Sequence, residues 1–193
     1  MGIKQYIIYD LEATCDDKSI NPRYPHEIIE IGAVRLNETA QLLDSFQTFI
    51  KPTTAPILTD FCKNLTGIRQ GDVDNAPFFA HAICDFEQWI TIRDADTMLI
   101  SWGYYDKTQL LEECENNHYN GIIVDLLANH RSIKHDFAKL PGKKRCGMKK
   151  ALEILGIPLT GTHHRGLDDA KNIAKIFTAV FAEWRHFIKT ENK

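Results

Sequence analysis

The sequence lacks any long apolar run and any leader-like start, and each absence excludes a class of protein. No stretch approaches the about 18 consecutive apolar residues of a membrane-spanning helix. The first residues, MGIKQYII, have neither the long apolar core nor the small-residue cleavage site of a signal peptide. We therefore expect a cytoplasmic protein that does not enter a membrane.

Cysteine is also scarce and scattered. The five cysteines lie at positions 15, 62, 84, 114 and 146, and no two form a C-x-x-C pair. An odd number at wide spacing argues against a disulfide framework, and the missing pair argues against a zinc cluster.

The composition is that of an ordinary globular chain, with an uneven distribution of charge. At 193 residues, 44% hydrophobic and 25% charged, the chain is predicted to form one domain over residues 1–193, with a core from about 6 to 187. Residues 131–150 hold eight Lys and Arg against one acid, a charge of +7, so the net charge of −3 leaves −10 for the rest. This basic stretch is either a track for a phosphate backbone or a solvated surface.

Apolar periodicity predicts a mixed α/β chain. Short apolar runs predict strands at 5–12, 27–36, 42–51 and 97–102, and wider periods predict helices at 57–67, 77–92, 107–117, 147–156 and 167–187. The run at 121–127 fits either a fifth strand or the start of a helix. Because a meander of three strands is followed by strands that alternate with helices, the pattern favours a mixed sheet flanked by helices.

The first predicted strand ends in two acids. Successive side chains of a strand point to opposite faces, so Asp10 and Glu12 share one face and Leu11 points away. Two carboxylates at the edge of a core repel each other and lose hydration unless a proton, a cationic partner or a metal relieves them. Alone, the pair fits either a metal site or two solvated acids beyond the sheet.

A third acid, Asp106, follows the strand at 97–102. It can cap the next helix, with Gln109 three residues later completing a capping box, or it can join the first two acids. Hard divalent cations prefer carboxylate oxygens, and a site for two of them needs about three or four acids from separate elements.

The segment GTHHRGLDDAKNIAKIF places a histidine five residues before an acid in two registers. Helical phase aligns Asp169 with the core-side residues Ile173 and Ile176, which selects the pair His164 and Asp169. On this interpretation Asp168 is a favourable charge at the helix N-terminus and His163 is a solvated loop residue.

Together these segments resemble a known family. DLEATC, SWGYYD and HRGLDDAKNIA are similar, in order and spacing, to the three motifs of the DEDDh 3′ to 5′ exonucleases, which belong to the DnaQ-like group of the RNase H-like superfamily. HEIIEIGAV, LTGI and ALEILGI resemble the branch that contains the histone-mRNA 3′-end exonucleases, the RNAi-limiting exonucleases and KapD. The resemblance extends from about residue 6 to 187 and implies a three-layer α/β fold whose five-stranded mixed sheet carries the first motif on its central strand.

The resemblance also assigns roles to residues. It implies that two divalent ions, Mg²⁺ or Mn²⁺, are held by Asp10, Glu12, Asp106 and Asp169, and that His164 is the general base. Phe61 resembles an aromatic residue that stacks on the terminal base, and the backbone near Ala13 and Thr14 is expected to line the same nucleotide pocket. One departure from the family is Lys107, which follows the second-motif acid where an apolar residue is expected.

The implied function is metal-dependent hydrolysis of single-stranded nucleic acid 3′ ends, RNA rather than DNA, to 5′-mononucleotides. The expected partner is a single-stranded 3′ end, and the sequence leaves protein partners open. Two alternatives stay open. One is a DNA-directed repair or proofreading exonuclease, and the other is a catalytically silent nucleic-acid-binding module on the same fold.

Overall fold

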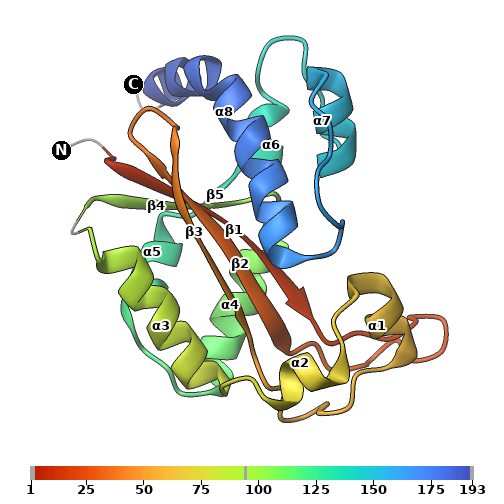
Figure 1. Ribbon diagram of the computed structural model, residues 1–193. Coiled ribbons are helices and arrows are strands. Elements are labelled where there is room, and N and C mark those ends of the chain that lie inside the picture. The colour runs from red at the N-terminus through yellow and green to blue at the C-terminus, as the bar shows by residue number, and fades with distance from the viewer. Residues whose placement is uncertain (1–2, 94, 192–193) are drawn as a thin grey trace.

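The structure is a computed structural model that describes residues 3–93 and 95–191. Its centre is a five-stranded mixed sheet in the order β3-β2-β1-β4-β5 (Figure 1). The strands are β1 (Gln5–Ala13), β2 (Ile28–Asn37), β3 (Leu42–Phe49), β4 (Thr97–Ser101) and β5 (Arg131–Ser132).

Strand β1 lies in the middle of this sheet, as predicted. It pairs antiparallel with β2, which pairs antiparallel with β3, and it pairs parallel with β4, which pairs parallel with β5. Both edges of β1 are therefore paired, and helices pack on both of its faces, which explains its near-continuous apolar sequence.

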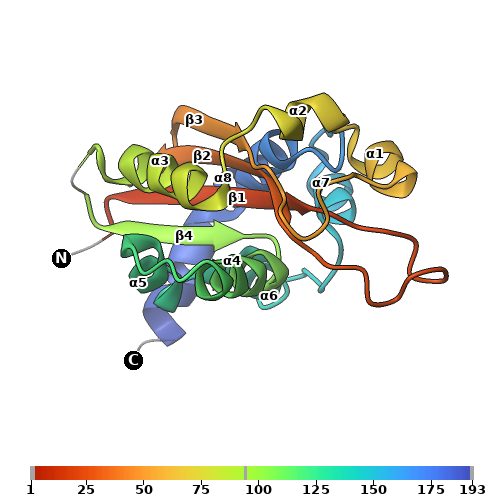
Figure 2. The same ribbon diagram turned by 90° about the horizontal axis from the view of Figure 1, so that it is seen from below.

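Helices cover the two faces. They are α1 (Asp60–Thr66), α2 (Gln70–Asp74), α3 (Phe79–Thr91), α4 (Tyr105–Asn116), α5 (Ile122–Ala128), α6 (Ile133–Phe137), α7 (Met148–Leu155) and α8 (Gly166–Glu191). Figure 2 shows α8 behind the sheet and α3, α4 and α5 in front of it. Tyr6 and Ile8 of β1 pack in the core with α6, α7 and α8, whereas Ile7, Tyr9 and Leu11 pack with α3, α4 and α5.

Two segments resolve or refine the sequence predictions. The run at 121–127 forms the helix α5 rather than a strand, and the fifth strand is the two-residue β5 that follows it. The short helix α1 begins after Thr59, whose side chain accepts a hydrogen bond from the backbone N–H of Cys62. It ends at Gly67, which has the left-handed φ of 70° that glycine adopts most easily.

Helix α8 crosses the sheet at a close approach between two glycines. A Cβ atom on Gly32 of β2 would overlap the backbone of Gly166 and Leu167 at the start of α8. Only glycine therefore lets the first turn of α8 reach the sheet at this point, and this turn carries Asp169.

All five cysteines are free thiols. Among the described residues, no helix combines the length and apolar character that crossing a bilayer requires.

Candidate active site

The two acids of β1 point toward α8. Since Tyr6 and Ile8 belong to the core under α8 and Leu11 to the opposite core, Asp10 and Glu12 share the α8 face, as the strand period predicted. The pairing of β1 with β2 shifts register between Glu12 and Ala13, so Glu12 is the last residue before a bulge. Bulges are common beside active sites, where they redirect a side chain.

The first turn of α8 brings a third acid to this face. Oxygen atoms of Asp10, Glu12 and Asp169 all lie within 4.8 Å of one another. Burial first, and then the charge of Asp169, raises the pKa of Glu12 from 4.5 to about 8. Burial first, and then Asp106, raises the pKa of Asp10 well above its usual range. The cluster therefore concentrates negative charge that needs a counterion.

The fourth predicted acid, Asp106, lines the same cavity. Its interpretation as a helix cap is wrong, because α4 begins at Tyr105 and its N-cap residue, Tyr104, makes no side-chain cap. Instead Asp106 Oδ1 accepts a hydrogen bond from the backbone N–H of Leu11 at 3.2 Å. The predicted box partner, Gln109, donates to the carbonyl oxygen of His26 at 2.7 Å. Asp106 is thus tied to the strand that carries Asp10 and Glu12.

A network missed by the sequence analysis supports Asp106 from behind. Burial raises the pKa of Asp106 to about 6, opposed by hydrogen bonds from Leu11 and Ser101. Ser101 Oγ also lies 3.0 Å from His130 Nε2. The pKa of His130 falls to about 4, chiefly through burial and then through the charge of Lys107. Lys107, the departure from the family pattern, is half-buried on this side of the site.

The two histidines before α8 both contact Asp169. The backbone N–H of His164 donates to Asp169 Oδ2 at 3.0 Å, and His163 Nδ1 lies 2.8 Å from the same oxygen. The two rings stack with centroids 3.9 Å apart. The prediction that His163 is a solvated loop residue is therefore wrong, while the pairing of His164 with Asp169 has a structural counterpart through the backbone.

The two adjacent aspartates at the start of α8 point in different directions, as the helical period predicted. Asp169 is buried against the sheet, with 5% of its surface exposed. Asp168 lies on the other side of the helix, where its Oδ2 accepts a hydrogen bond from the backbone N–H of Thr162 at 2.8 Å. The acid that points into the cavity is Asp169.

A fifth acid, Glu30, lies under the site and was not predicted. It pairs directly with Glu12 across the sheet and is fully buried. Its carboxylate accepts hydrogen bonds from Arg165 Nε at 3.2 Å and from the backbone N–H of Gly166 at 3.1 Å. Glu30 therefore holds the start of α8 against β2. The acid in the run HEIIEIGAV was visible in the sequence, but the register that sets it opposite Glu12 was not.

The carboxylate cluster fits divalent cations. Asp169 Oδ1 is buried and has no hydrogen-bond partner among the described residues. Within the same part of the chain, the carboxylates of Asp10 and Glu12 accept no hydrogen bond. An oxygen without a partner, next to two others at ligand spacing, matches the preference of Mg²⁺ and Mn²⁺ for carboxylate oxygens.

These side chains surround one cavity of about 460 Å³. Its wall also includes Trp102, Gly103, Tyr105, Lys134, Gly147 and Met148. A cavity of this size accommodates a group as large as a nucleotide. The residues of its wall come from elements that lie far apart in the sequence, from β1 to the first turn of α8.

The three predicted substrate contacts lie outside the wall of this cavity. Phe61 lies on α1 with 41% of its surface exposed. Thr14 is buried, and its Oγ1 donates to the carbonyl oxygen of Pro25 at 2.7 Å. The carbonyl oxygen of Ala13 accepts a weak bond from Cys62 Sγ at 3.7 Å, which ties α1 to the end of β1. The roles of these residues stay predictions.

Comparison with known proteins matches the chain to one family model and to named relatives. The model of the family described as "Exonuclease" (RNase_T) matches residues 7–177. The human protein "3'-5' exoribonuclease 1" is 34% identical over 176 residues, which cover 88% of this chain and 50% of the relative. The mouse protein "ERI1 exoribonuclease 3" is 31% identical over 195 residues, covering 95% of this chain and 55% of the relative. The chain thus spans about half the length of these curated relatives.

Solved structures match as well. The nuclease domain of 3'hExo, described as a DEDDh family member bound to rAMP, superposes with a TM-score of 0.85 at 30% identity, covering 93% of this chain and 92% of that one. A 3′-exonuclease in a structure of histone mRNA stem-loop recognition superposes with a TM-score of 0.84 at 28% identity, covering 94% and 83%. These matches confirm the predicted RNase H-like fold of a mixed five-stranded sheet between helices.

Proposed function

Because the chain belongs to the RNase_T exonuclease family, as its motifs predicted, we propose that it is a 3′ to 5′ exonuclease that shortens single-stranded RNA and releases 5′-mononucleotides. The observation that carries this proposal is the cluster of Asp10, Glu12 and Asp169 within 4.8 Å, with Asp106 in the same cavity. RNA is favoured over DNA because the named relatives are exoribonucleases and one matched nuclease domain holds rAMP.

Two divalent cations, Mg²⁺ or Mn²⁺, would be held by Asp10, Glu12, Asp106 and Asp169. When bound, such ions neutralise charge on the phosphate and lower the pKa of water. Four acids from three separate elements provide the ligands, since two come from β1, one from α4 and one from α8. Burial first, and then the charges of Asp169, Glu30 and Asp106, raise the pKa of Glu12, so the ionised cluster is costly in the folded protein unless a cation binds to it.

His164 is proposed to take the proton from the attacking water. Burial, and then the neighbouring His163, lowers the pKa of His164, so that its imidazole is neutral and able to accept a proton near neutral pH. Its backbone bond to Asp169 and its stacking on His163 fix the position of the ring. General base catalysis of this kind contributes about 10² to 10⁴ in rate.

We assign the terminal nucleotide to the space between the acids and α1. There the exposed ring of Phe61 is available for stacking on the base, and the end of β1 at Ala13 and Thr14 forms the adjoining wall. Stacking on an aromatic ring tolerates any base, which suits an enzyme that removes successive nucleotides.

A silent binding module is the weaker candidate. Acids gathered at ligand spacing repel a polyanion when no cation is bound, so this cavity is poorly suited to bind nucleic acid without metal. A DNA-directed exonuclease would use the same acids, and only the choice of substrate separates it from the main proposal.

One experiment tests these alternatives. RNA and DNA oligonucleotides of matched sequence, labelled at the 5′ end, are incubated with the protein and Mn²⁺, and the products are resolved by length. We expect a ladder of labelled fragments shortened one nucleotide at a time, faster for RNA, and no cleavage in EDTA. Internal cuts or cleavage in EDTA would refute the exonuclease proposal. Faster cleavage of DNA than of RNA would refute RNA as the preferred substrate. Inactivity with Mn²⁺ would favour the binding module.

A further inference from the structure

The basic stretch at 131–150 divides into paired and unpaired cations. Arg131 and Lys139 form salt bridges with Glu191, Arg131 also pairs with Asp136, and Lys150 pairs with Glu153. The other five make no salt bridge with any residue that the structure describes. We call them the unpaired strip: Lys134, Lys143, Lys144, Arg145 and Lys149.

The strip begins in the wall of the catalytic cavity. Lys134 lines this cavity together with the acids, and its backbone N–H donates to the carbonyl oxygen of Trp102 at 3.0 Å. The loop after α6 returns to the cavity at Gly147 and Met148, which also line it. A lysine in this wall, close to several acids but paired with none of them, keeps its charge available for a ligand.

Two more members of the strip lie near the same wall. Lys149, on the first turn of α7, directly follows Met148 of the cavity wall. Arg145 lies two residues before Gly147 of the same wall. The side chains of Arg145 and Lys149 are exposed to solvent. Cations therefore lie near the cavity at both ends of the α6–α7 loop.

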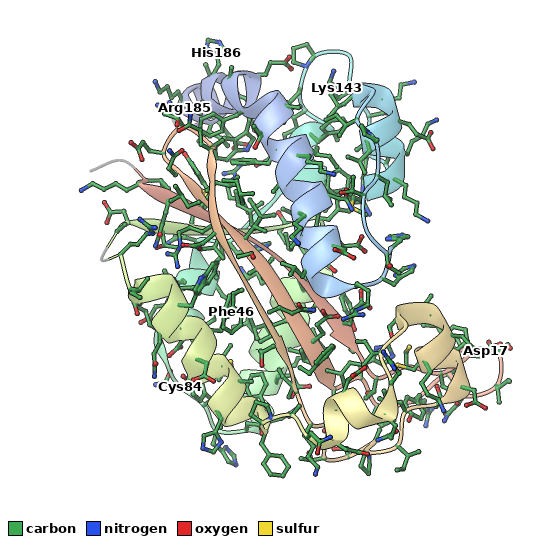
Figure 3. The ribbon with its side chains drawn as sticks, in the orientation of Figure 1. Asp17, Phe46, Cys84, Lys143, Arg185 and His186 are labelled. Carbon is green, nitrogen blue, oxygen red and sulfur yellow. The ribbon has the colours of Figure 1, made fainter. Side chains whose placement is uncertain are left out.

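The strip continues outward along this loop. Figure 3 shows Lys143 on the outer part of the loop between α6 and α7, and Lys144 follows it in the chain. An exposed aromatic ring, that of Tyr104, lies beside the part of the strip that is nearest the cavity. Tyr104 has 50% of its surface exposed, lies two residues before Asp106 and stacks on His135 with ring centroids 4.7 Å apart. Cations beside an exposed aromatic ring are typical of a surface that binds a single strand.

We propose that the unpaired strip binds the phosphates upstream of the cleaved bond, so that a single strand leaves the cavity past Lys134 and Tyr104 and follows the α6–α7 loop. The proposal rests on the proposed function, since it takes the 3′ end to lie among the acids. On this proposal, both interpretations of the basic stretch at 131–150 apply to different residues. The paired cations stabilise α6, α7 and the end of α8, whereas the unpaired cations bind the phosphates of the substrate.

A matched pair of double variants tests the strip. Arg145→Gln/Lys149→Gln removes two unpaired cations, and Lys139→Gln/Lys150→Gln removes two paired ones from the same stretch with the same change in net charge. Binding of a fluorescently labelled 12-nucleotide RNA is measured by anisotropy over a range of salt concentrations, in EDTA, where no cleavage occurs and the contacts outside the metal-free acids dominate binding. For a single strand, each phosphate contact adds about 0.7 to the steepness with which the logarithm of the binding constant falls with the logarithm of the salt concentration. If the first variant loses two contacts, this slope should become shallower by about 1.4, and binding at 0.1 M salt should be roughly 25-fold weaker.

The control variant, Lys139→Gln/Lys150→Gln, should show the same dependence of RNA binding on salt concentration as the unmodified protein. Equal losses in both variants would show a general effect of net charge and would overturn the proposal, as would an unchanged slope in Arg145→Gln/Lys149→Gln. A cleavage measurement with Mn²⁺ separates this outcome from failure of the proposed function. A dinucleotide has no phosphate upstream of its cleaved bond, so the ratio of kcat/KM for the 12-mer to that for the dinucleotide should fall only in the first variant. If neither substrate is cleaved by any form, the exonuclease proposal fails while the binding result stands.

Discussion

Replacing Glu12 by Gln should stabilise the metal-free protein while removing its response to metal. Glu12 is 8% exposed, lies directly opposite Glu30 in the sheet and belongs to the carboxylate cluster with Asp10 and Asp169. Burial first, and then Asp169, raises its pKa from 4.5 to about 8. Gln has nearly the same shape and no charge, so the variant removes both the cost of burying the charge and the repulsion, with little change in packing.

The direction and size of the expected change in the free energy of unfolding follow from the uptake of a proton by Glu12 on folding. A carboxyl group whose pKa is higher in the folded than in the unfolded state takes up a proton on folding. Its contribution is complete below pH 4.5 and is lost as the pH rises through about 8. At pH 7 the loss for Glu12 is about 3 kcal/mol. Glu12→Gln avoids this loss, and for a chain of this size about 3 kcal/mol corresponds to a rise of about 6 to 12 °C in Tm.

The assay is urea unfolding followed by circular dichroism, in EDTA and in Mn²⁺, at pH 5 and pH 8. In EDTA the unmodified protein should lose stability between pH 5 and pH 8, and Glu12→Gln should lose less. Mn²⁺ should stabilise the unmodified protein by mass action and the variant much less. A variant that is less stable than the unmodified protein in EDTA at pH 8, or an unmodified protein whose stability does not change between these pH values, would refute the reasoning.

Three further predictions concern single residues. His164→Ala should lower kcat for RNA cleavage by about 10² to 10⁴ and leave the Kd for RNA in EDTA nearly unchanged, because the ring moves a proton rather than holding the strand. Asp169→Asn should abolish cleavage and weaken Mn²⁺ binding measured by calorimetry; cleavage at the unmodified rate would remove Asp169 from the site. Gly32→Ala should destabilise the fold by about 3 kcal/mol or more in urea, because its Cβ overlaps the backbone of Leu167, and an unchanged midpoint would contradict this close approach.

Side-chain periodicity accounts for what the sequence predicted well. Asp10 and Glu12 share a face because strands repeat every two residues, and Asp169 points inward because helices repeat every 3.6. Both patterns are local, so they can be read without knowing how the elements pack. The short run at 121–127 was ambiguous for the same reason, since a few apolar residues fit a buried strand as well as one helical turn.

The remaining features depend on backbone geometry and register that composition does not reveal. His164 has a left-handed φ of 65°, a turn that precedes the contact of both histidines with Asp169. A residue other than glycine adopts this conformation uncommonly, so it could not be predicted from the residue type. Asp106 looked like a helix cap, but its bond to Leu11 joins residues 95 positions apart. Glu30 acquires its place from a register that only the folded sheet defines.

The order of the elements along the chain affects when the acids can act. Asp10 and Glu12 lie on the first strand, whereas Asp169 lies on the last helix. A nascent polypeptide still on the ribosome therefore lacks a complete set of carboxylates until α8 has been translated and has docked at Gly32. For a chain proposed to degrade RNA, this order delays hydrolytic competence until α8 has been made and has packed on the sheet.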